Sequence, residues 1–362
     1  MDIKKTPLFE EHKKLEAKFG PFGGWDMPIS YSGIIQEHNW TRKSACIFDI
    51  CHMGEFIISG PKAAEALNKI VTMNVEEIPL KSCKYGFMLN ETGGVIDDLI
   101  VYKIEADKFM MVVNAATTNK DLENLKKHLP ESISLENISD NIAKIDLQGP
   151  LSREIIQDVL SVDVSSLEYY TFSSYNFLGQ ENIISRTGYT GELGFEIYVE
   201  VDKAVELWGK LLSDERVKPA GLGARDTLRL EMSYPLYGHE LDDNTGPLEA
   251  GLKMFVDLEK DFIAKDMLLK SQQEGLKKRL VCFKVNSRRA PRNGYKILKD
   301  NNEIGAVTSG SFSPSLGYGI GMGYITPEYK DAGTQIKLTD SKVQLEAEII
   351  KRPFYKDGSL KK

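Results

Sequence analysis

Apolar residues recur at helical spacing in some stretches of the chain and at alternate positions in others, so helices and strands intermingle along its length. The helical spacing predicts helices over residues 61–71, 119–129, 150–160 and 201–212. Short β-rich runs bounded by turn residues predict strands over residues 108–114, 143–149 and 182–188. This mixture is typical of an α+β protein and does not follow the regular order of βαβ units.

The pattern changes at Arg279, after which short strand-like runs follow one another and no helix is indicated. A series of short strands without helices predicts a small β-barrel or sandwich. The lysine- and glutamine-rich stretch 270–278 is the expected boundary in front of it. We interpret the glycine-rich run GYGIGMGY (317–324) as a tightly packed strand, because it opens no helix and no Lys-Ser or Lys-Thr follows it.

Composition narrows the class of protein. The chain has 362 residues, enough for two or three domains, and its formal net charge of -7 argues against a surface that binds nucleic acid throughout. We find neither a signal-peptide core nor an apolar run of membrane length, so we expect a cytoplasmic protein without a membrane partner. Four cysteines without a CxxC pair and five histidines without HxxxH spacing predict no metal site.

The stretch VIDDLIVYK (95–103) places two adjacent carboxylates, Asp97 and Asp98, in a predicted strand. Successive side chains of a strand point to opposite faces, so the two carboxylates cannot form a catalytic dyad. At least one lies among apolar neighbours, where a carboxylate needs donors, a cation or a ligand. The alternative is that both cap the turn at 91–94 or end the strand. The predicted neighbours of Asp98 on its own face are Ile96, Ile100 and Tyr102.

The stretch SRTGYTGELGFEIYV (185–199) predicts two strands around a glycine-rich turn. Glu196 lies on one face of the second strand and is either a solvent-facing charge or an acceptor for the planar N–H edge of a heterocycle. In the second case, Tyr189 in the turn would flank the ring. The opposite face of the strand carries Phe195, Ile197 and Val199.

The stretch AGLGARDTLRLEM (220–232) predicts a helix that follows two glycines. Arg225 and Arg229 repel each other at i,i+4 unless an anion lies nearby. Asp226 can pair with Arg229, whereas Arg225 has no such local partner. GLGARD is not GxGxxG, so the stretch does not indicate a dinucleotide site.

Eight stretches considered together carry a family resemblance. They follow one order from residue 6 to residue 355 and are TPLFEEH, GGWDMPISY, FDICHMGEF, LNETGGVIDDLIVYK, SRTGYTGELGFEIYV, PAGLGARDTLRLE, SGSFSPSLGYGIGMGYI and KRPFY. Together they resemble the aminomethyltransferases, or T-proteins, of the glycine cleavage system. The wider folate-binding family also contains demethylating enzymes, usually fused to a flavin region, and an iron-sulfur maintenance protein with a K-G-C-Y-x-G-Q-E signature. This chain has GYTGELGFE at that signature, without cysteine, and the folate-type module takes up nearly all of it.

The resemblance implies a three-lobed cloverleaf fold with folate in its central hole. A folate-binding region over residues 1–275 would comprise two interleaved α+β lobes, one formed by residues 1–52 with 138–245 and the other by residues 53–137. The third lobe would be a C-terminal β-barrel over residues 276–362.

The activity implied by the resemblance is transfer of a methylene from the aminomethyl group on the lipoyl arm of the H-protein to tetrahydrofolate. The products are 5,10-methylenetetrahydrofolate, ammonia and the dihydrolipoyl H-protein. The alternatives are a non-catalytic folate-binding maintenance or regulatory protein, and folate-dependent demethylation with a separate flavoprotein. The basic tail around Lys351 and Arg352 is a candidate contact for the glutamate end of folate or for the H-protein.

Carried over to matching positions, the family's site implies that Asp98 is the catalytic residue, which orients the folate and stabilises developing positive charge. Asp97 would have a structural role. Whether Arg225 meets the ligand directly or holds Glu196 in place stays open. The residues implied to bind folate are Tyr85, Asn114, Tyr169, Tyr189, Glu196 and Arg225.

Overall fold

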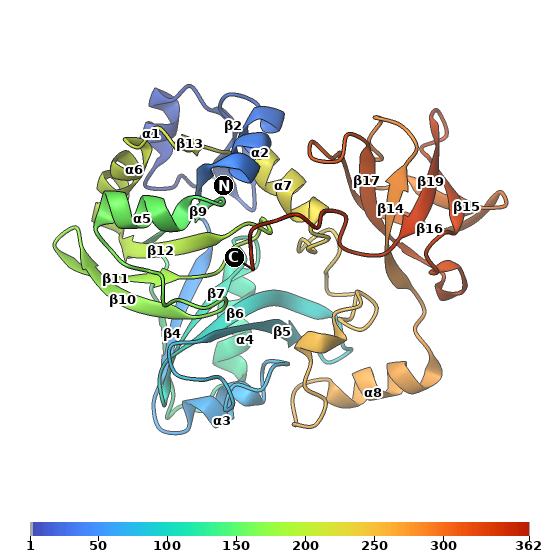
Figure 1. The fold of residues 1–362 in the computed structure, drawn as a ribbon. Helices are drawn as coiled ribbons and strands as arrows, with labels where there is room; N and C mark the ends of the chain where they lie inside the picture. Colours follow the sequence, from blue (N-terminus) through green and yellow to red (C-terminus); the bar gives the residue numbers. More distant parts are fainter. Residues whose placement is uncertain (1–2, 362) are drawn as a thin grey trace.

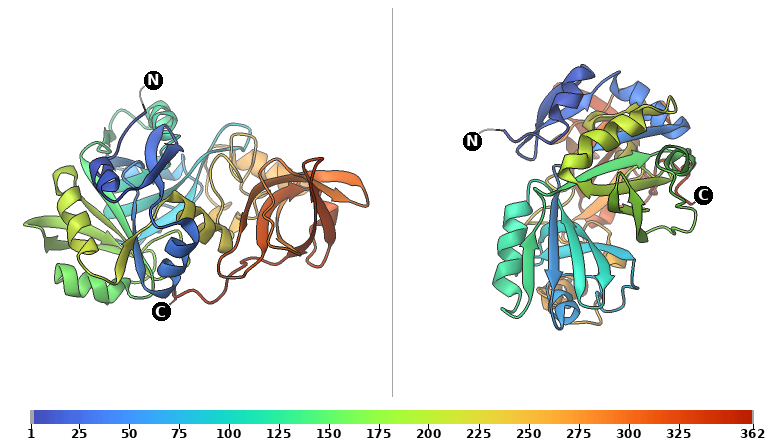
Figure 2. Two further views of the ribbon diagram at one scale, coloured as in Figure 1. Left: turned by 90° about the horizontal axis from the view of Figure 1, so that it is seen from above. Right: turned by 90° about the vertical axis from the view of Figure 1, so that its left-hand side faces the viewer.

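The computed structural model describes residues 3–361 and arranges them in a six-stranded sheet, a five-stranded sheet and a closed barrel, with a two-stranded hairpin near the start (Figure 1). Figure 2 shows the barrel, in orange to dark red, at one end of the molecule and the two sheets at the other. The α+β class and the C-terminal barrel predicted from the sequence are confirmed. None of the helices in the described part of the chain has the length and apolar character needed to cross a membrane.

The six-stranded sheet has the strand order β10-β11-β12-β9-β3-β13. Helices α5 (Ser152–Leu160) and α6 (Ala204–Leu212) pack on one face, over the apolar residues of the two central strands. Helices α2 (Ile34–Lys43) and α7 (Leu222–Glu231) pack against β3 on the other face. The strands are β3 (Ala45–Asp49), β9 (Ile142–Gln148), β10 (Phe172–Phe177), β11 (Gln180–Ser185), β12 (Gly194–Glu200) and β13 (Val217–Pro219).

The five-stranded sheet has the order β5-β6-β7-β4-β8. Helices α3 (Ala63–Asn68) and α4 (Thr118–His128) cover one face. Its opposite face meets the six-stranded sheet through a cluster that includes Tyr102 and Tyr198. The strands are β4 (Gly54–Ser59), β5 (Cys83–Leu89), β6 (Val95–Glu105), β7 (Lys108–Val113) and β8 (Ser134–Asn137).

The two sheets are interleaved in the chain. The whole five-stranded sheet is inserted between β3 and β9, which are hydrogen-bonded neighbours in the six-stranded sheet. The interleaved lobes expected from the resemblance are therefore present, whereas the residue limits of each lobe stay a prediction. In the chain, both sheets are preceded by α1 (Phe9–Lys14) and by the hairpin of β1 (Lys18–Phe22) and β2 (Trp25–Ser30).

Two predicted helices are shorter than their apolar pattern. The pattern over 61–71 extends past α3 because Ile70 and Val71 are core residues that follow the helix. The pattern over 201–212 begins with a separate 3-10 turn, η1 (Val201–Lys203), before α6. Burial explains the extra apolar positions after α3, whereas η1 has no buried residue and only continues the apolar spacing of α6.

The C-terminal barrel closes in the order β14-β17-β16-β15-β18-β19. Helix α8 (Lys265–Glu274) precedes it, so the first half of the expected boundary 270–278 is helical. A Cβ on Gly321 would lie 2.6 Å from the Phe283 ring, which confirms that the glycine-rich run is a tightly packed strand. The strands are β14 (Arg279–Val285), β15 (Lys296–Lys299), β16 (Asn302–Phe312), β17 (Gly319–Ile325), β18 (Gln335–Thr339) and β19 (Gln344–Ile350), and 3-10 turns η2 (Lys253–Phe255) and η3 (Pro327–Tyr329) complete the elements.

Helix α7 joins the barrel to the sheets. Glu231 accepts hydrogen bonds from the hydroxyl groups of Ser313 (2.5 Å) and Ser315 (2.8 Å) in the barrel. Arg229 donates from Nη2 to Ser309 of β16 at 2.8 Å. These are charge-assisted hydrogen bonds, two of them buried and that of Ser315 partly buried, so they hold the barrel in one orientation against the site described below.

Gly94 lies in the turn between β5 and β6, where a Cβ would lie 1.8 Å from the carbonyl oxygen of Asp243. We expect Gly94→Ala to lower the free energy of unfolding by on the order of 1–3 kcal/mol, because the clash is with backbone that cannot rotate away. The matched control is Gly209→Ala on the exposed face of α6, where nothing lies within 4 Å. It should raise the free energy of unfolding by about 0.5–1 kcal/mol. Urea unfolding of both variants checks the opposite signs, and equal effects would contradict the prediction.

Candidate active site

Asp98 lies near the start of β6, on the face that meets the six-stranded sheet. Tyr85 of β5 donates from Oη to Oδ2 of Asp98 at 2.8 Å, and Asn114 donates from Nδ2 to Oδ1 at 2.9 Å. Burial raises the pKa of Asp98 to about 7, and the charge of Asp97 contributes to the increase. Asp98 therefore changes its charge close to neutral pH, which an exposed aspartate does not.

Asp97 is fully buried on the opposite face of β6. Its carboxylate accepts the backbone N–H of Asn114 at 2.9 Å and the side-chain amide of the same residue at 2.8 Å. Burial raises the pKa of Asp97. The pKa of nearby Asp121 rises to about 10, because Asp121 is buried and lies next to the charge of Asp97. Asp121 is thus the member of this pair that keeps a proton at neutral pH. One amide group, that of Asn114, holds Asp97 and Asp98 although they lie on opposite faces.

Strand alternation correctly separated the two aspartates, but it was wrong for Ile96. Met88 of β5 pairs with Asp97 whereas Leu89 pairs with Val95, so Ile96 is the extra residue of a β-bulge. Ile96 packs in the core under α3 and α4 and does not share the face of Asp98.

The turn between β5 and β6 does not use the aspartates as caps. Asn90 accepts hydrogen bonds at Oδ1 from the backbone N–H groups of Thr92 and Gly94, each at 3.0 Å. The interpretation in which Asp97 and Asp98 cap this turn is therefore wrong.

Glu196 is buried on β12, with 4% of its surface exposed, so it is not a solvent-facing charge. Its Oε2 accepts a hydrogen bond from Thr187 at 2.7 Å and from Tyr102 of β6 at 3.3 Å. The Lys144 ammonium lies 3.4 Å from the same oxygen. Burial opposes ionisation, but Lys144 and Thr187 outweigh it and lower the pKa of Glu196. Glu196 is therefore an ionised acceptor at neutral pH.

Arg225 of α7 reaches across to β9, where its Nη1 donates to Oδ2 of Asp146 at 2.8 Å. Asp146 lies opposite Glu196 in the strand register, so Arg225 hydrogen-bonds the neighbour of Glu196, and its charge also helps to lower the pKa of Glu196. Burial raises the pKa of Asp146 to about 7, although Arg225 opposes the increase. The predicted local pair is present as well, since Arg229 lies 2.7 Å from Asp226.

Tyr189 connects the two groups of charged residues. The guanidinium of Arg225 lies 5.1 Å from the centre of the Tyr189 ring, and Tyr234 stacks on Tyr189 at 5.7 Å. Burial and the Asp98 carboxylate both raise the pKa of Tyr189. Tyr189 is also one of the groups that raise the pKa of Tyr85. Asp98, Tyr85, Tyr189 and Arg225 therefore lie close enough to influence one another electrostatically.

Within residues 3–361, neither Tyr169 nor Arg352 of the basic tail hydrogen-bonds to Asp98 or Glu196. Tyr169 is 38% exposed and packs edge-on against Tyr170, with ring centres 4.6 Å apart. Burial and the neighbouring Tyr170 and Tyr234 raise its pKa, so it extends the row of tyrosines that begins at Tyr189. In the tail, Arg352 donates to the carbonyl oxygen of Ala250 at 3.1 Å.

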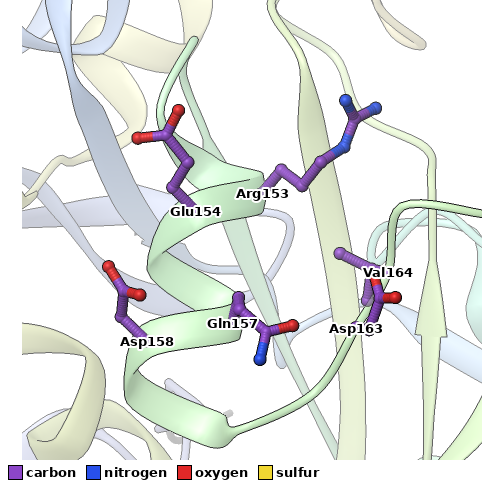
Figure 3. A pocket seen from close by; sticks show the side chains of 6 residues that line it. All are labelled: Arg153, Glu154, Gln157, Asp158, Asp163 and Val164. Atoms are coloured by element: carbon purple, nitrogen blue, oxygen red, sulfur yellow. The ribbon is translucent and has the colours of Figure 1, made fainter.

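A surface hollow of about 390 Å³ lies on a different part of the molecule. Its location on α5, which packs on the face of the six-stranded sheet opposite to Asp146 and Glu196, separates it from the carboxylate site. Within residues 3–361, no three His, Cys, Asp or Glu residues are grouped so that they could hold a metal ion. Figure 3 shows the residues that line the hollow, which are Arg153, Glu154, Gln157, Asp158, Asp163 and Val164.

Two family models together match nearly the whole chain. The GCVT N-terminal domain matches residues 8–260, and the glycine cleavage T-protein C-terminal barrel domain matches residues 278–356. The chain belongs to the glycine cleavage T-protein family. The family resemblance inferred from the eight sequence stretches is confirmed.

Full-length relatives of this T-protein carry the name aminomethyltransferase. The protein from Halothermothrix orenii is 48% identical over 356 residues, which cover 97% of this chain and 100% of that protein. The protein from Bacteroides thetaiotaomicron is 45% identical over 362 residues, covering 98% and 100%. The crystal structure of glycine cleavage system aminomethyltransferase T from Bartonella henselae matches with a TM-score of 0.94 at 33% identity, covering 99% of both chains.

Three residues of this T-protein site were missed from the sequence, namely Lys144, Asp146 and Gln148 of β9. They alternate with residues of the apolar core, and Gln148 donates to Asp146 at 2.6 Å. The available signal was a run of three polar residues at every second position of a strand whose other positions are apolar. That signal indicates a polar face, but it does not tell whether the face is buried.

Glu55 of β4 faces the same charged cluster and is 1% exposed, and no residue in the range 3–361 donates to its Oε1. Burial raises its pKa from 4.5 to about 8. The folded chain therefore holds a proton that the unfolded chain releases, so this group removes stability as the pH rises from about 4.5 to about 8. Glu55→Gln should make the unfolding free energy fall less steeply with pH, by up to about 1.4 kcal/mol per pH unit inside this window.

Urea unfolding of this T-protein at several pH values between about 5 and 8 measures the slope. Glu136→Gln, at an exposed position on neighbouring β8, is the matched control and should leave the slope unchanged. Parallel curves for the wild type and Glu55→Gln would contradict the assignment of a buried, protonated Glu55.

Proposed function

We propose that this T-protein catalyses aminomethyl transfer in the glycine cleavage system, with tetrahydrofolate as co-substrate and the lipoylated H-protein as partner. It transfers the methylene carbon of the aminomethyl group on the lipoyl arm to tetrahydrofolate, with release of ammonia and the dihydrolipoyl H-protein. The observation that carries the proposal is the full-length similarity to proteins named aminomethyltransferase. The geometry of the site supplies residues suited to this chemistry.

The side chain of Glu196 suits the N–H edge of a reduced pterin. Every donor to Glu196 within residues 3–361 contacts Oε2, and none contacts Oε1. An ionised oxygen with free lone pairs is a strong acceptor for such an edge. The flat ring of Tyr189 offers a face for stacking, and the Arg225 guanidinium lies beside it. These features support tetrahydrofolate as the ligand.

Asp98 is the proposed catalytic residue. Bound tetrahydrofolate supplies the amine that attacks the methylene carbon, and positive charge develops as ammonia leaves. An ionised Asp98 stabilises that charge, and a pKa near 7 also lets it exchange a proton with the reacting amine. Tyr85 and Asn114 each bind one oxygen of the carboxylate, so its orientation is set before the ligand arrives.

Replacing Asp98 tests the function and the residue together. With aminomethylated H-protein and tetrahydrofolate, the wild type should form methylenetetrahydrofolate and ammonia in equal amounts. Asp98→Asn keeps the shape but not the charge, so we expect turnover to fall by about 10²- to 10⁴-fold, with little loss of folate affinity. The two products are measured by absorbance and by an ammonia assay.

The outcomes separate the alternatives. Folate binding by the wild type without ammonia release would indicate a non-catalytic folate-binding protein. Activity that appears only with a separate flavoprotein would indicate demethylation. Full turnover by Asp98→Asn would leave the family function intact but remove Asp98 from the mechanism.

Asp97 should influence the reaction through the charge of Asp98. Because the Asp97 charge raises the pKa of Asp98, Asp97→Asn should lower that pKa and move the acidic limb of the rate profile to lower pH. It should also reduce stability, since the two donors of Asn114 lose a charged acceptor. A rate profile measured over pH, together with urea unfolding, checks both effects. An unchanged acidic limb would leave Asp97 with a structural role alone.

A further inference from the structure

Lys144 is a lysine that β9 places inside the protein, with 1% of its side chain exposed. A buried ammonium is costly unless it is paired. Its anionic partner is Glu196, whose Oε2 lies 3.4 Å from Nζ. The other contacts of Nζ are weaker, namely the Met53 sulfur at 3.6 Å and the face of the Tyr198 ring at 5.3 Å. The ammonium group of Lys144 is therefore directed at Glu196.

The two oxygens of Glu196 have different surroundings. Oε2 receives hydrogen bonds from Thr187 at 2.7 Å, Tyr102 at 3.3 Å and Tyr198 at 3.5 Å, in addition to the Lys144 ammonium. Within residues 3–361 no donor reaches Oε1. The protein thus holds one oxygen from several sides and leaves the other for a donor from outside.

We propose that Lys144 is a positioning residue of the ligand site, which anchors Oε2 of Glu196 and so presents Oε1 to the N–H edge of the reduced pterin. The inference rests on the proposed function, because that function names the ligand. Lys144 itself does not touch the ligand. It acts through Glu196.

The other cation near Glu196 does not fill this role. Arg225 is 2.8 Å from Asp146, and its side chain is 15% exposed, compared with 1% for Lys144. It reaches Asp146 from α7, whereas Lys144 lies on β9, directly next to the strand of Glu196. Lys144 is thus the cation in contact with Glu196.

The Lys144 ammonium keeps the pKa of Glu196 low. Burial raises the pKa of Glu196, and Lys144 is the largest of the influences that lower it. Without the ammonium, burial would prevail and Glu196 would take up a proton at higher pH, losing the charge that makes Oε1 a strong acceptor. The other titratable groups around Glu196 are Asp146 on β9, Tyr198 on β12, Tyr102 on β6, Cys83 on β5, Glu55 on β4 and Arg225 on α7.

The test is the affinity for tetrahydrofolate as a function of pH in Lys144→Met, which keeps the length of the side chain but not its charge. We expect binding to weaken by about tenfold or more near pH 6 and to recover toward the wild-type value near pH 8.5, where Glu196 ionises again. Lys144→Arg keeps the charge and should restore most of the affinity at low pH. A loss that is equal at all pH values would mean that Lys144 is only structural, and would overturn the proposal.

The matched control is Lys284→Met in the barrel. Lys284 also lies on a strand and has its ammonium 3.4 Å from a glutamate, Glu348, but it is far from the site and about a third exposed. Its replacement should change neither the affinity nor the pH dependence. Similar profiles for Lys284→Met and Lys144→Met would contradict a specific role for Lys144.

A double variant attributes the effect to Glu196. In a Glu196→Gln background, Lys144→Met should add no further pH-dependent loss, because there is no carboxylate left to protonate. A persistent pH-dependent loss would assign the effect to Asp146 or Glu55 and overturn the proposal. If Lys144→Met does not fold by circular dichroism, Lys144→Gln, which keeps a donor without charge, carries the same expectation.

The result for the wild type separates this proposal from the proposed function. A wild-type chain that binds no tetrahydrofolate would contradict the function. A wild type that binds, with Lys144 variants that follow its pH profile, would contradict only the role of Lys144.

Discussion

The site depends on one constraint, which is that charged groups buried inside the protein need partners there. Asp97 and Asp146 are fully buried, and Lys144 is nearly so. Taking such groups out of water costs several kcal/mol each, by order of magnitude, unless opposite charges or hydrogen bonds compensate. The arrangement of these three residues follows from this requirement, because Asp97 is held by Asn114, Asp146 by Arg225 and Lys144 by Glu196.

The interleaved topology brings these partners together. Because the five-stranded sheet is inserted between two adjacent strands of the six-stranded sheet, β6 faces β12 although they are distant in the chain. Tyr102 follows Asp98 by four residues on β6 and donates to Glu196 on β12. The strand that carries the proposed catalytic aspartate is thus tied to the strand that carries the proposed ligand acceptor. The barrel is hydrogen-bonded to α7, and α7 carries Arg225, which binds Asp146 in the same region.

Two carboxylates in one site acquire different charge states from their surroundings. Asp98 is buried next to a second acid, so its pKa rises to about 7. Glu196 is buried next to an ammonium and several hydroxyl groups, so its pKa falls. Pairs of acids with pKa values shifted in opposite directions allow one group to exchange protons while the other stays charged. In this T-protein, the separation comes from which neighbours each strand meets.

Side-chain alternation was enough to place Asp97 and Asp98 on opposite faces and to place Glu196 on the face opposite to Phe195, Ile197 and Val199. The spacing of short strands after Arg279 was enough to predict a β-barrel or sandwich there. These features are local, since they depend on the period of a strand and on the spacing of turns. The bulge at Ile96, the shared amide of Asn114 and the pairing of Arg225 with Asp146, 79 residues away, became visible only in the tertiary structure. The physical reason is that a single strand specifies which way its side chains point, whereas the groups they meet depend on which distant strands and helices become its neighbours.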